Sequence, residues 1–439
     1  MFIHWIVLFF PSIQTQSLVS YNHPIFPPSS SWSPTATTFA NHSQIGWNPI
    51  GLHIDSTDSI YTFNRDNGQI LIWSNNSTQI FYSNLSPSAR SIFVTVNREI
   101  FIGDSGSIKQ ISPNTTSIIN TSSICYGLFV DLNNSLYCSM YSRHRIVRLR
   151  LNVVETIAGN GSAGSTANQL EGPFGIFVDT NFDLYVADFE NDRVQLFRSG
   201  QTNAITVAGG QIIKLKNPSH VILDGKKYVF IADGGNHRII GSNENGFRCI
   251  VGCSGSGGST QEKLRFPRSL AFDSFGNLFV TDLNNSRIQK FERITWLKFE
   301  RSREFSIVPD VLFNCTSQWI LKNSSNTILI ETGFSELFIP ARKLPLGVYK
   351  LEFTGCLTSL IYIEIIPTNI IPNLVQFGTS MITSGFEQDL KLDPGTYSID
   401  PDEVSFDSKV RFSIDFIPQF FRKFIEMDLQ ILLSNLSNI

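Results

Sequence analysis

Leu184–Phe197 reads LYVADFENDRVQLF, and this stretch recurs along the chain. Leu278–Phe291 reads LFVTDLNNSRIQKF, Val229–Ser242 reads VFIADGGNHRIIGS, and Leu136–Leu149 reads LYCSMYSRHRIVRL. Each copy follows a second shared piece, such as GPFGIFVDTNF from Gly172. Self-similarity at a period of roughly 40–50 residues is typical of repeat architectures, in which neighbouring units bury one continuous core.

The repeated unit contains short runs rich in β-branched and aromatic residues, separated by polar turns. Such runs are typical of β-strands. The copy from Pro173 contains four of them, which are Phe177–Asp179, Leu184–Ala187, Val194–Phe197 and Ala204–Gly209. Four antiparallel strands per unit predict one blade of a β-propeller.

Two weaker copies, Pro49–Trp73 and Arg90–Ile111, bring the expected number of blades to six, starting near residues 49, 89, 125, 173, 218 and 267. The last copy ends at Phe291 after three strands, whereas Thr37–Ala40 (TTFA) lies ahead of the first copy. We expect this N-terminal segment to supply the missing outer strand, because closing the ring removes an exposed sheet edge.

Three copies carry an aspartate and an arginine at matching positions, and these pairs are Asp188/Arg193, Asp233/Arg238 and Asp282/Arg287. A ring of functional charges is one interpretation. A hydrogen-bonded tether between strands and turn is the other, and we favour it because a feature repeated from blade to blade is expected to be architectural.

The unit Leu-Tyr-Val-Ala-Asp…Asn-x-Arg-[Ile/Val]-x-x-Phe resembles the NHL repeat, and the resemblance covers residues 48–292. It implies a six-bladed propeller that acts as a binding platform. Some NHL-like propellers are enzymes, notably the peptidyl-hydroxyglycine amidating lyase. The segment Trp32–Gly46 also resembles the lead-in of secreted NHL proteins.

A second resemblance lies downstream, in SELFIPARKLPLGVYKLEFT from Ser335 and LDPGTYSIDPDE from Leu392. These motifs are similar to the REJ (receptor for egg jelly) region of polycystin-like ectodomains, over about residues 305–405. From Phe412 the chain departs from that pattern, so a truncated region is one interpretation. Short apolar runs separated by turns predict an all-β module here.

The expected fold is therefore all-β, a six-bladed NHL-type propeller followed by a smaller β-sandwich-like module. The expected segments are a signal peptide at 1–17, an N-terminal linker at 18–34, the propeller at 35–292, a REJ-like module at 293–405 and a poorly defined tail at 406–439.

Several features predict an extracellular protein. Phe2–Phe10 (FIHWIVLFF), with Thr15 and Ser17 as a small-residue cleavage pair, is typical of a signal-peptide core, with a buried strand as the alternative. No later stretch reaches about 18 uninterrupted apolar residues, so we expect no transmembrane segment after it. Glycosylation sequons begin at Asn41, Asn76, Asn84, Asn114, Asn120, Asn133, Asn160, Asn284, Asn314 and Asn323, with further ones at Asn75 and Asn435.

The chain has 6 cysteines, which suit disulfides in an oxidising compartment. Cys125 and Cys138 flank a predicted hairpin, and Cys249 and Cys253 could close a tight loop. Cys315 and Cys356 remain for the C-terminal module, although spacing alone does not determine connectivity. The net charge of -3 comes with 16% charged residues and no basic stripe, so we expect no nucleic-acid partner.

Catalysis in a propeller is expected at the central channel. Only His220, near the start of an inner strand, is a candidate to face it, whereas His53 matches the strand position of Phe177. The amidating lyase needs several channel histidines for its zinc, because a catalytic zinc takes three protein ligands. The corresponding positions of other blades carry Gly51, Gly127, Gly175 and Ser269. We therefore predict no enzyme, no cofactor and no metal, with His220 as the weak metal candidate.

The aspartates that recur after the first strand of a blade could form a calcium site. We interpret them instead as turn residues that accept hydrogen bonds from their own backbone, and they are Asp55, Asp131, Asp179, Asp224 and Asp273. His144 and His237 occupy blade turns just before the arginine position, and we expect both to be structural.

A binding surface remains, because propellers present loops on a rigid disc. The candidate exposed groups on these loops are Met140, Tyr141, Arg143, Phe189, Glu190 and Leu283. We predict a secreted, extracellular and non-catalytic binding scaffold for a protein or glycan ligand. The alternatives are a propeller hydrolase or amidating lyase with a channel metal, and an ectodomain fragment of a polycystin-like membrane protein.

Overall fold

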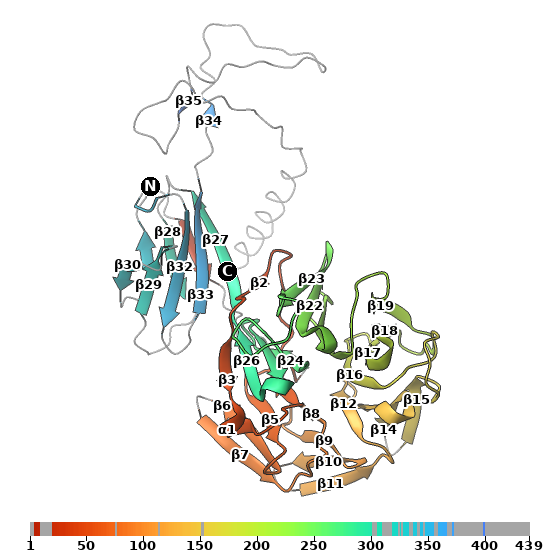
Figure 1. The fold of residues 1–439 in the computed structure, drawn as a ribbon. Coiled ribbons are helices and arrows are strands. Elements are labelled where there is room, and N and C mark those ends of the chain that lie inside the picture. Colours follow the sequence, from red (N-terminus) through yellow and green to blue (C-terminus); the bar gives the residue numbers. More distant parts are fainter. Residues whose placement is uncertain are drawn as a thin grey trace, which may run out of the picture.

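The computed structural model describes residues 4–8, 20–74, 77–112, 115–150 and 153–300, together with the shorter segments 305–309, 318–323, 325, 328–332, 337–339, 343–345, 347–354, 359–366, 371–372 and 398–399. Its largest part is a propeller of six four-stranded antiparallel sheets arranged as a disc (Figure 1). The predicted all-β fold with six blades is confirmed.

The strands follow one another in sequence within each of the first five blades. Blade 1 contains β4 (Leu52–Ile54), β5 (Ile60–Asn64), β6 (Gln69–Ser74) and β7 (Ser77–Ser83). Blade 2 contains β8 (Ser91–Val94), β9 (Ile100–Asp104), β10 (Ser107–Ser112) and β11 (Thr115–Asn120). Blade 3 contains β12 (Cys125–Val130), β13 (Leu136–Met140), β14 (Arg145–Arg150) and β15 (Val153–Ala158).

Blade 4 contains β16 (Pro173–Val178), β17 (Leu184–Asp188), β18 (Arg193–Phe197) and β19 (Ile205–Gly209). Blade 5 contains β20 (Pro218–Leu223), β21 (Val229–Asp233), β22 (Arg238–Asn243) and β23 (Gly246–Val251). Blade 6 combines β24 (Pro267–Phe272), β25 (Leu278–Asp282) and β26 (Arg287–Phe291) with β3 (Thr37–Ala40) from ahead of blade 1. β3 pairs antiparallel with β26, with Ala40 opposite Ile288 and Thr38 opposite Gln289. The ring is therefore closed by hydrogen bonds between distant parts of the chain.

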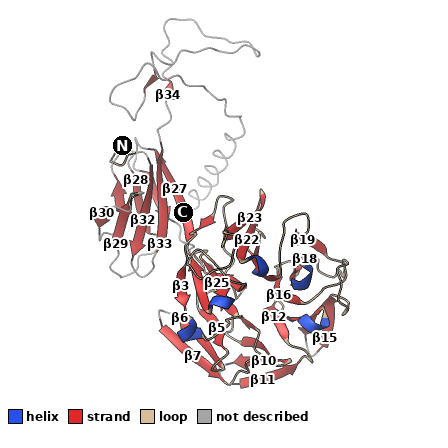
Figure 2. Cartoon of the chain, in the orientation of Figure 1, coloured by secondary structure: helices blue, strands red, loops and turns tan. Residues whose placement is uncertain are grey.

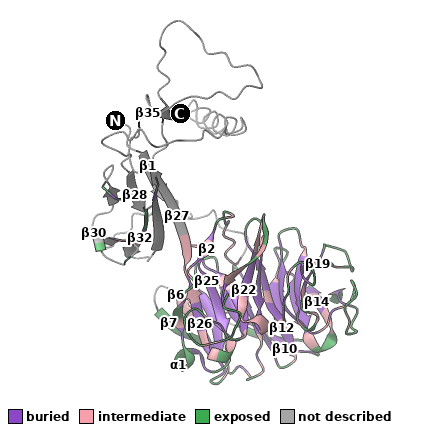
Figure 3. Ribbon diagram, turned by 45° about the horizontal axis from the view of Figure 1, so that its top comes forward, coloured by how far each residue is buried: buried purple, intermediate pink, exposed green. Residues whose placement is uncertain are grey.

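The first strands of the blades are innermost and neighbour one another around the axis. Every residue of the second strands β5, β9, β13, β17, β21 and β25 is buried, and so is nearly every residue of the first strands (Figure 3). These strands are continuous apolar runs because neighbouring blades cover both of their faces. The hydrophobic core consequently lies between neighbouring blades all around the ring, and not in a single layer.

Short helical turns follow the second strand in four blades: η1 (Tyr141–Arg143), η2 (Phe189–Asn191), η3 (Gly234–Asn236) and η4 (Leu283–Asn285) (Figure 2). Each ends at a residue with a left-handed backbone, as at His144 and His237. The Nδ1 atoms of these two histidines accept hydrogen bonds from the backbone N–H groups of Gly172 and Phe266, at 3.2 and 3.1 Å. Both histidines therefore join adjacent blades. We call the side of the disc that carries these turns the η face.

The opposite side of the disc is closed by residues 20–26, which lie within the stretch expected to be a linker. The Tyr21 ring packs against Phe129 and Phe177 at centroid distances of 5.5 and 5.2 Å. The Nδ2 of Asn22 donates to the Asp55 carbonyl at 3.0 Å and to the Phe272 carbonyl at 3.3 Å. These contacts reach several blades, so the segment covers this end of the central channel. We call this side the closed face.

The turns of the closed face contain the recurring aspartates. The Oδ1 of Asp131 accepts hydrogen bonds from the N–H groups of Asn133 and Ser135, both at 2.8 Å. Asp55, Asp179 and Asp224 likewise accept from residues two and four positions further on, and Asp273 accepts from Asn277 four positions on. This is the geometry by which an aspartate satisfies the backbone of its own turn.

A second set of strands lies outside the propeller. A six-stranded sheet contains β2 (Ser31–Trp32), β27 (Arg293–Glu300), β33 (Ser359–Ile366), β32 (Gly347–Thr354), β29 (Gln318–Lys322) and β30 (Ile328–Thr332). A three-stranded sheet contains β1 (His4–Leu8), β28 (Phe305–Pro309) and β31 (Leu337–Ile339), and β34 (Ile371–Pro372) pairs with β35 (Ser398–Ile399). The short α-helix α1 (His42–Ile45) is capped by Asn41 and follows β3.

Candidate functional site

The repeated Asp–Arg pairs bind loop to strand inside the blades. In blade 6, Asp282 accepts hydrogen bonds from Arg265 N–H at 2.6 Å, Asn285 Nδ2 at 2.8 Å and Arg287 Nε at 2.7 Å. Arg287 also donates to the carbonyls of Ser259, Thr260 and Lys263. Burial raises the pKa of both Asp188 and Asp282, against the effect of these donors. The pairs Asp188/Arg193 and Asp233/Arg238 have the same geometry, at 2.7 and 2.8 Å. This arrangement is the tether expected from the sequence.

Blade 3 lacks this tether. Met140 occupies the position of Asp188 and is only 1% exposed, so its prediction as an exposed binding-loop residue is wrong. The residue is buried because it ends the second strand of its blade, where the other blades place the buried carboxylate. Arg145 then has no carboxylate opposite, and its Nε is buried without a partner among the described residues.

At the η face, one side chain from every blade surrounds the mouth of the central channel. Each lies five positions before the residue that opens the closed-face turn, at the very start of the innermost strand. They line one cavity with a volume of about 30 Å³. We call them the mouth ring, and they are Ile50, Arg90, Tyr126, Phe174, Ser219 and Arg268.

β-Bulges set the mouth ring in blades 3 to 6. The pairing of β12 with β13 skips Tyr126, and that of β20 with β21 skips Ser219. The pairings in blades 4 and 6 shift register at Phe174 and Arg268 in the same way. A bulged residue leaves the regular alternation of the strand, which re-aims its side chain. The same irregularity therefore presents four different side chains at one place.

Arg268 is the most unusual member of the ring. The residue is 8% exposed, and its guanidinium carbon lies 3.4 Å from the centroid of the Phe174 ring. Burial lowers the pKa of Arg268 to about 9, with Arg90 and Arg65 adding to this effect and Tyr126 and Tyr141 opposing it. The group is still charged at physiological pH.

An aromatic cluster extends from Arg268 across the η face of blades 3 and 4. The rings of Tyr126 and Tyr141 both pack edge-to-face against Phe174, at centroid distances of 4.9 and 5.2 Å. Phe189 stacks on Phe174 at 4.2 Å. The Tyr141 hydroxyl donates to Glu190 Oε1 at 2.5 Å, and this hydrogen bond raises the pKa of Tyr141 to about 12. The cluster therefore combines aromatic rings, a buried cation and a hydrogen-bonded carboxylate.

The other loop candidates, Arg143 and Leu283, do not contact this cluster among the described residues. Arg143 is exposed on η1, while Leu283 is half-buried and packs against the core of blades 1 and 2. Tyr141, Phe189 and Glu190 are thus brought together, whereas Arg143 and Leu283 share no described contact with them. Sequence reasoning missed Arg268, Phe174 and Tyr126. Their shared repeat position was the available signal, because all three directly precede the channel position of their blade.

The channel does contain His220, which is half-buried and lies beside Gly175. Burial, followed by the charge of Arg268 and then that of His53, lowers the pKa of His220 to about 4. His53 lies on the closed-face side, where its Nε2 is 3.3 Å from the Ser20 carbonyl oxygen. Among the described residues, no three His, Cys, Asp or Glu side chains are grouped as a metal would require. The channel residues therefore do not fit the three-ligand zinc site of an amidating lyase.

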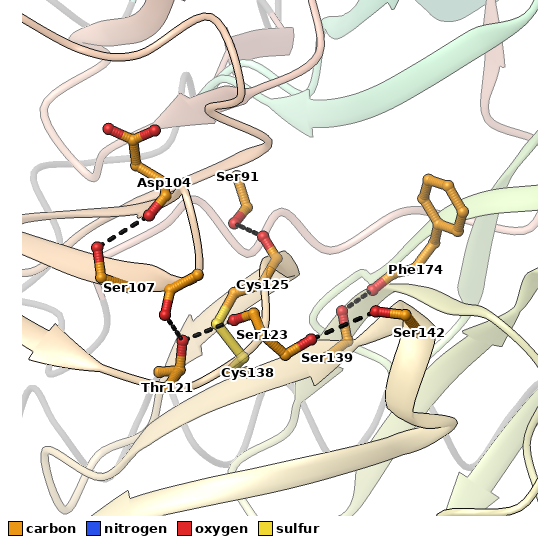
Figure 4. Close-up of a disulfide and its surroundings, with 11 residues drawn as sticks. Ser91, Asp104, Ser107, Thr121, Ser123, Cys125, Cys138, Ser139, Ser142 and Phe174 are labelled. Carbon is orange, nitrogen blue, oxygen red and sulfur yellow. Dashed lines mark hydrogen bonds between the residues drawn. A yellow bond between two sulfur atoms is a disulfide. The ribbon is translucent and has the colours of Figure 1, made fainter.

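Disulfides and sequons lie around the disc. Cys125 bonds to Cys138 between the two inner strands of blade 3, next to hydroxyls that donate to neighbouring blades (Figure 4). Cys249 bonds to Cys253, while Cys315 and Cys356 lie outside the described residues. The sequon asparagines Asn41, Asn84, Asn120, Asn133, Asn160 and Asn284 are exposed, and Asn323 is half-buried. Asn76, Asn114 and Asn314 lie outside the described residues.

Comparison with known proteins places this geometry in a class. Residues 264–291, which include β24 to β26, match the model of the NHL repeat. The mouse protein named NHL repeat-containing protein 3 is 30% identical over 90 residues, which cover 19% of this chain and 25% of that protein. The chain thus matches about a quarter of the length of this curated relative. The fold is thus a six-bladed propeller, and its sixth blade contains a unit that matches the NHL repeat.

Two solved structures are similar to this chain at low sequence identity. A virginiamycin B lyase from Staphylococcus aureus is 10% identical, with 58% of this chain and 98% of that chain covered and a TM-score of 0.44. An auxiliary nutrient binding protein from Bacteroides thetaiotaomicron is 14% identical, with 63% and 76% covered and a TM-score of 0.47. Within the described part of the chain, no helix has the length and apolar character needed to cross a membrane.

Proposed function

We propose that this chain is a secreted, non-catalytic binding protein that recognises an extracellular protein or glycan through the η face of its propeller. The observation that carries the proposal is the aromatic cluster beside Arg268. Aromatic residues and arginine are enriched at the energetic centres of protein interfaces, where they combine large contact area with directed polar groups. The rigid disc holds these groups in place before binding, which reduces the entropy lost on association.

The arrangement of the two faces supports this choice of surface. Residues 20–26 cover the channel on the closed face, whereas the mouth ring surrounds it on the η face. The exposed sequon at Asn133 lies in a closed-face turn. Asn284 lies on η4, in blade 6, so a glycan there would be attached to a different blade from Tyr141 and Phe189. A glycan at Asn133 would lie on the opposite face from the cluster and one at Asn284 on another blade, whereas Asn160 lies in the loop beside η1.

The test is binding of the purified, secreted chain to an array of defined extracellular glycans and peptides. Phe189→Ala and Tyr141→Ala should each lower the affinity for a bound ligand by at least about tenfold, because each truncates a central contact. The matched control is Ile205→Ala, which truncates an exposed apolar side chain on the outer strand β19. Equal binding by all three variants would contradict the proposed surface.

We further propose that residues 1–17 are a signal peptide and that the exposed sequons carry glycans. The two disulfides support this, because such bonds persist in oxidising compartments. In the full-length chain β1 pairs with β28, so removal of the peptide would also free β28 from this neighbour. N-terminal sequencing of the secreted protein should begin near residue 18, and glycosidase treatment should lower its mass. Retention of Met1 in secreted material would contradict the signal peptide.

The segment 293–405 is proposed to be a REJ-like β module. The tyrosine hydroxyl of Tyr349 donates to the Pro345 carbonyl at 2.8 Å, a contact that fixes the approach to a strand in sandwich domains. Limited proteolysis of the whole chain should leave a resistant fragment that begins near residue 293. Cleavage throughout this segment, at the rate of an unfolded chain, would contradict a folded module.

A further inference from the structure

Arg268 differs from the other arginines of the blades in its bonding partners. Arg193, Arg238 and Arg287 each bond a buried aspartate and several backbone carbonyls. Arg268 as a whole residue is 92% buried, and its guanidinium makes no hydrogen bond or ion pair with any described residue. Its described contacts are ring faces, with Phe174 at 3.4 Å and Tyr126 and Phe189 at 6.0 and 5.9 Å.

The charges around Arg268 have the same sign. Arg90 and Arg65 both lower its pKa, and both donate to the carbonyl of Pro87 rather than to a carboxylate. The nearby carboxylate of Glu190 is hydrogen-bonded to Tyr141, and that of Asp66 accepts from the Trp47 N–H. The described part of the chain therefore gathers three guanidinium groups near the channel mouth. Asp66 raises the pKa of Arg65, whereas no carboxylate of the described residues forms a hydrogen bond or ion pair with Arg268.

An unpaired buried cation is unfavourable, because the attraction of an aromatic face replaces only part of its lost hydration. A bound anion would complete the pair. The cavity beside Arg268, about 30 Å³ in volume, is also lined by Ser91, Ser219, Ser269 and His220. A buried water needs roughly 10–15 Å³ by this measure, so the space suits a group of two or three heavy atoms.

We propose that Arg268 binds the carboxylate of an acidic peptide segment, with the aromatic cluster contacting the apolar atoms that flank it. A guanidinium is a planar fork that matches a planar carboxylate through two parallel hydrogen bonds. One carboxylate also neutralises Arg268, the one buried cation of the mouth ring. A peptide is favoured because arginine surrounded by aromatic rings is typical of protein interfaces. This proposal rests on the proposed function and names the chemistry that the same surface recognises.

The stability of the unliganded protein provides a first test. If Arg268 is kept for binding, Arg268→Met should retain the packing on Phe174 and remove the uncompensated charge. The variant should then melt at or above the wild-type temperature in buffer without carboxylates. A clearly lower melting temperature, with the wild type unaffected by carboxylates, would assign Arg268 a structural role and overturn the proposal.

The direct test is calorimetric titration of the whole secreted chain with N-acetyl-Asp-Phe-amide and with its neutral counterpart N-acetyl-Asn-Phe-amide. We expect the acidic peptide to bind at least about tenfold more tightly, and Arg268→Gln to abolish this preference. Arg198→Gln, which removes an exposed guanidinium after β18, is the matched control and should behave as wild type. An equal preference in Arg268→Gln would overturn the proposal.

Further ligands distinguish a peptide carboxylate from a sugar carboxylate and from tetrahedral anions. Glucuronate presents a carboxylate on a sugar, whereas sulfate and phosphate present tetrahedral anions. Tighter binding of glucuronate than of the acidic peptide would overturn the peptide assignment, and tighter binding of sulfate or phosphate would overturn the carboxylate. Array ligands that depend on Phe189 and Tyr141 but not on Arg268 would refute this inference alone. Ligands that depend on none of the three would refute the proposed function itself.

Discussion

Replacing Asp282 by alanine should destabilise the propeller strongly, although the residue lies away from the channel. The carboxylate accepts three hydrogen bonds, from Arg265 N–H, Asn285 Nδ2 and Arg287 Nε, at 2.6 to 2.8 Å. The substitution leaves these donors without an acceptor and leaves the Arg287 charge unpaired. Breaking a buried pair in this way costs about 3–5 kcal/mol. Burial raises the pKa of Asp282, which shows that its hydration is not fully replaced, so the lower end of this range is expected.

The matched control is Arg148→Ala, which breaks the exposed pair between Arg148 and Glu155. These side chains are 36% and 56% exposed, so the loss should stay below about 1 kcal/mol. For a domain of this size, about 2–4 °C in melting temperature corresponds to each kcal/mol. Calorimetry of the secreted chain should therefore show a fall of roughly 10 °C for Asp282→Ala and of at most about 4 °C for Arg148→Ala. Equal shifts would refute the tether as a major source of stability.

Three further outcomes are expected. His53→Gln should weaken the pH dependence of the melting temperature between pH 6.5 and 4. Burial lowers the pKa of His53 to about 4, so the neutral imidazole stabilises the fold above pH 6.5. This contribution, roughly 3 kcal/mol, is lost as the pH falls to about 4. An unchanged pH dependence would count against a buried neutral His53, and the wild-type curve also contains the opposite effect of Asp273, whose pKa burial raises to about 6. Mild reduction followed by alkylation and mass spectrometry should label Cys249 and Cys253 before Cys125 and Cys138, which are fully buried, and simultaneous labelling of both pairs would contradict this order. Gly175→Ala should lower the free energy of unfolding, measured in urea, by about 1–3 kcal/mol, because a Cβ there would lie 2.7 Å from the His220 Cα. An unchanged free energy would show that blades 4 and 5 are less tightly packed.

The repeat made most of the propeller predictable from sequence. The number of blades follows from the in-register copies, and the three-stranded last copy required an additional strand, which the structure takes from Thr37–Ala40. Met140 shows where the same reasoning failed. It occupies the position of Asp188 and had to be buried like it, but the missing aspartate made the residue look like part of a polar turn.

The mouth ring could not be predicted in the same way. Phe174, Ser219 and Arg268 align in the repeats, yet the direction of their side chains depends on bulges, and a bulge becomes visible only when two strands are paired residue by residue. Residues 20–32 were equally hard to place, because their contacts with Phe177, Gly276 and other distant residues are set by the closed ring and not by local pattern.

The most direct test of the account is a crystal structure of the secreted chain grown with saturating acetate. We expect an acetate at the channel mouth, with both oxygens within hydrogen-bonding distance of the Arg268 guanidinium and the Phe174 ring on the other side of that group. A mouth occupied only by water, or by Glu190 or another carboxylate of the chain itself bonded to Arg268, would contradict it.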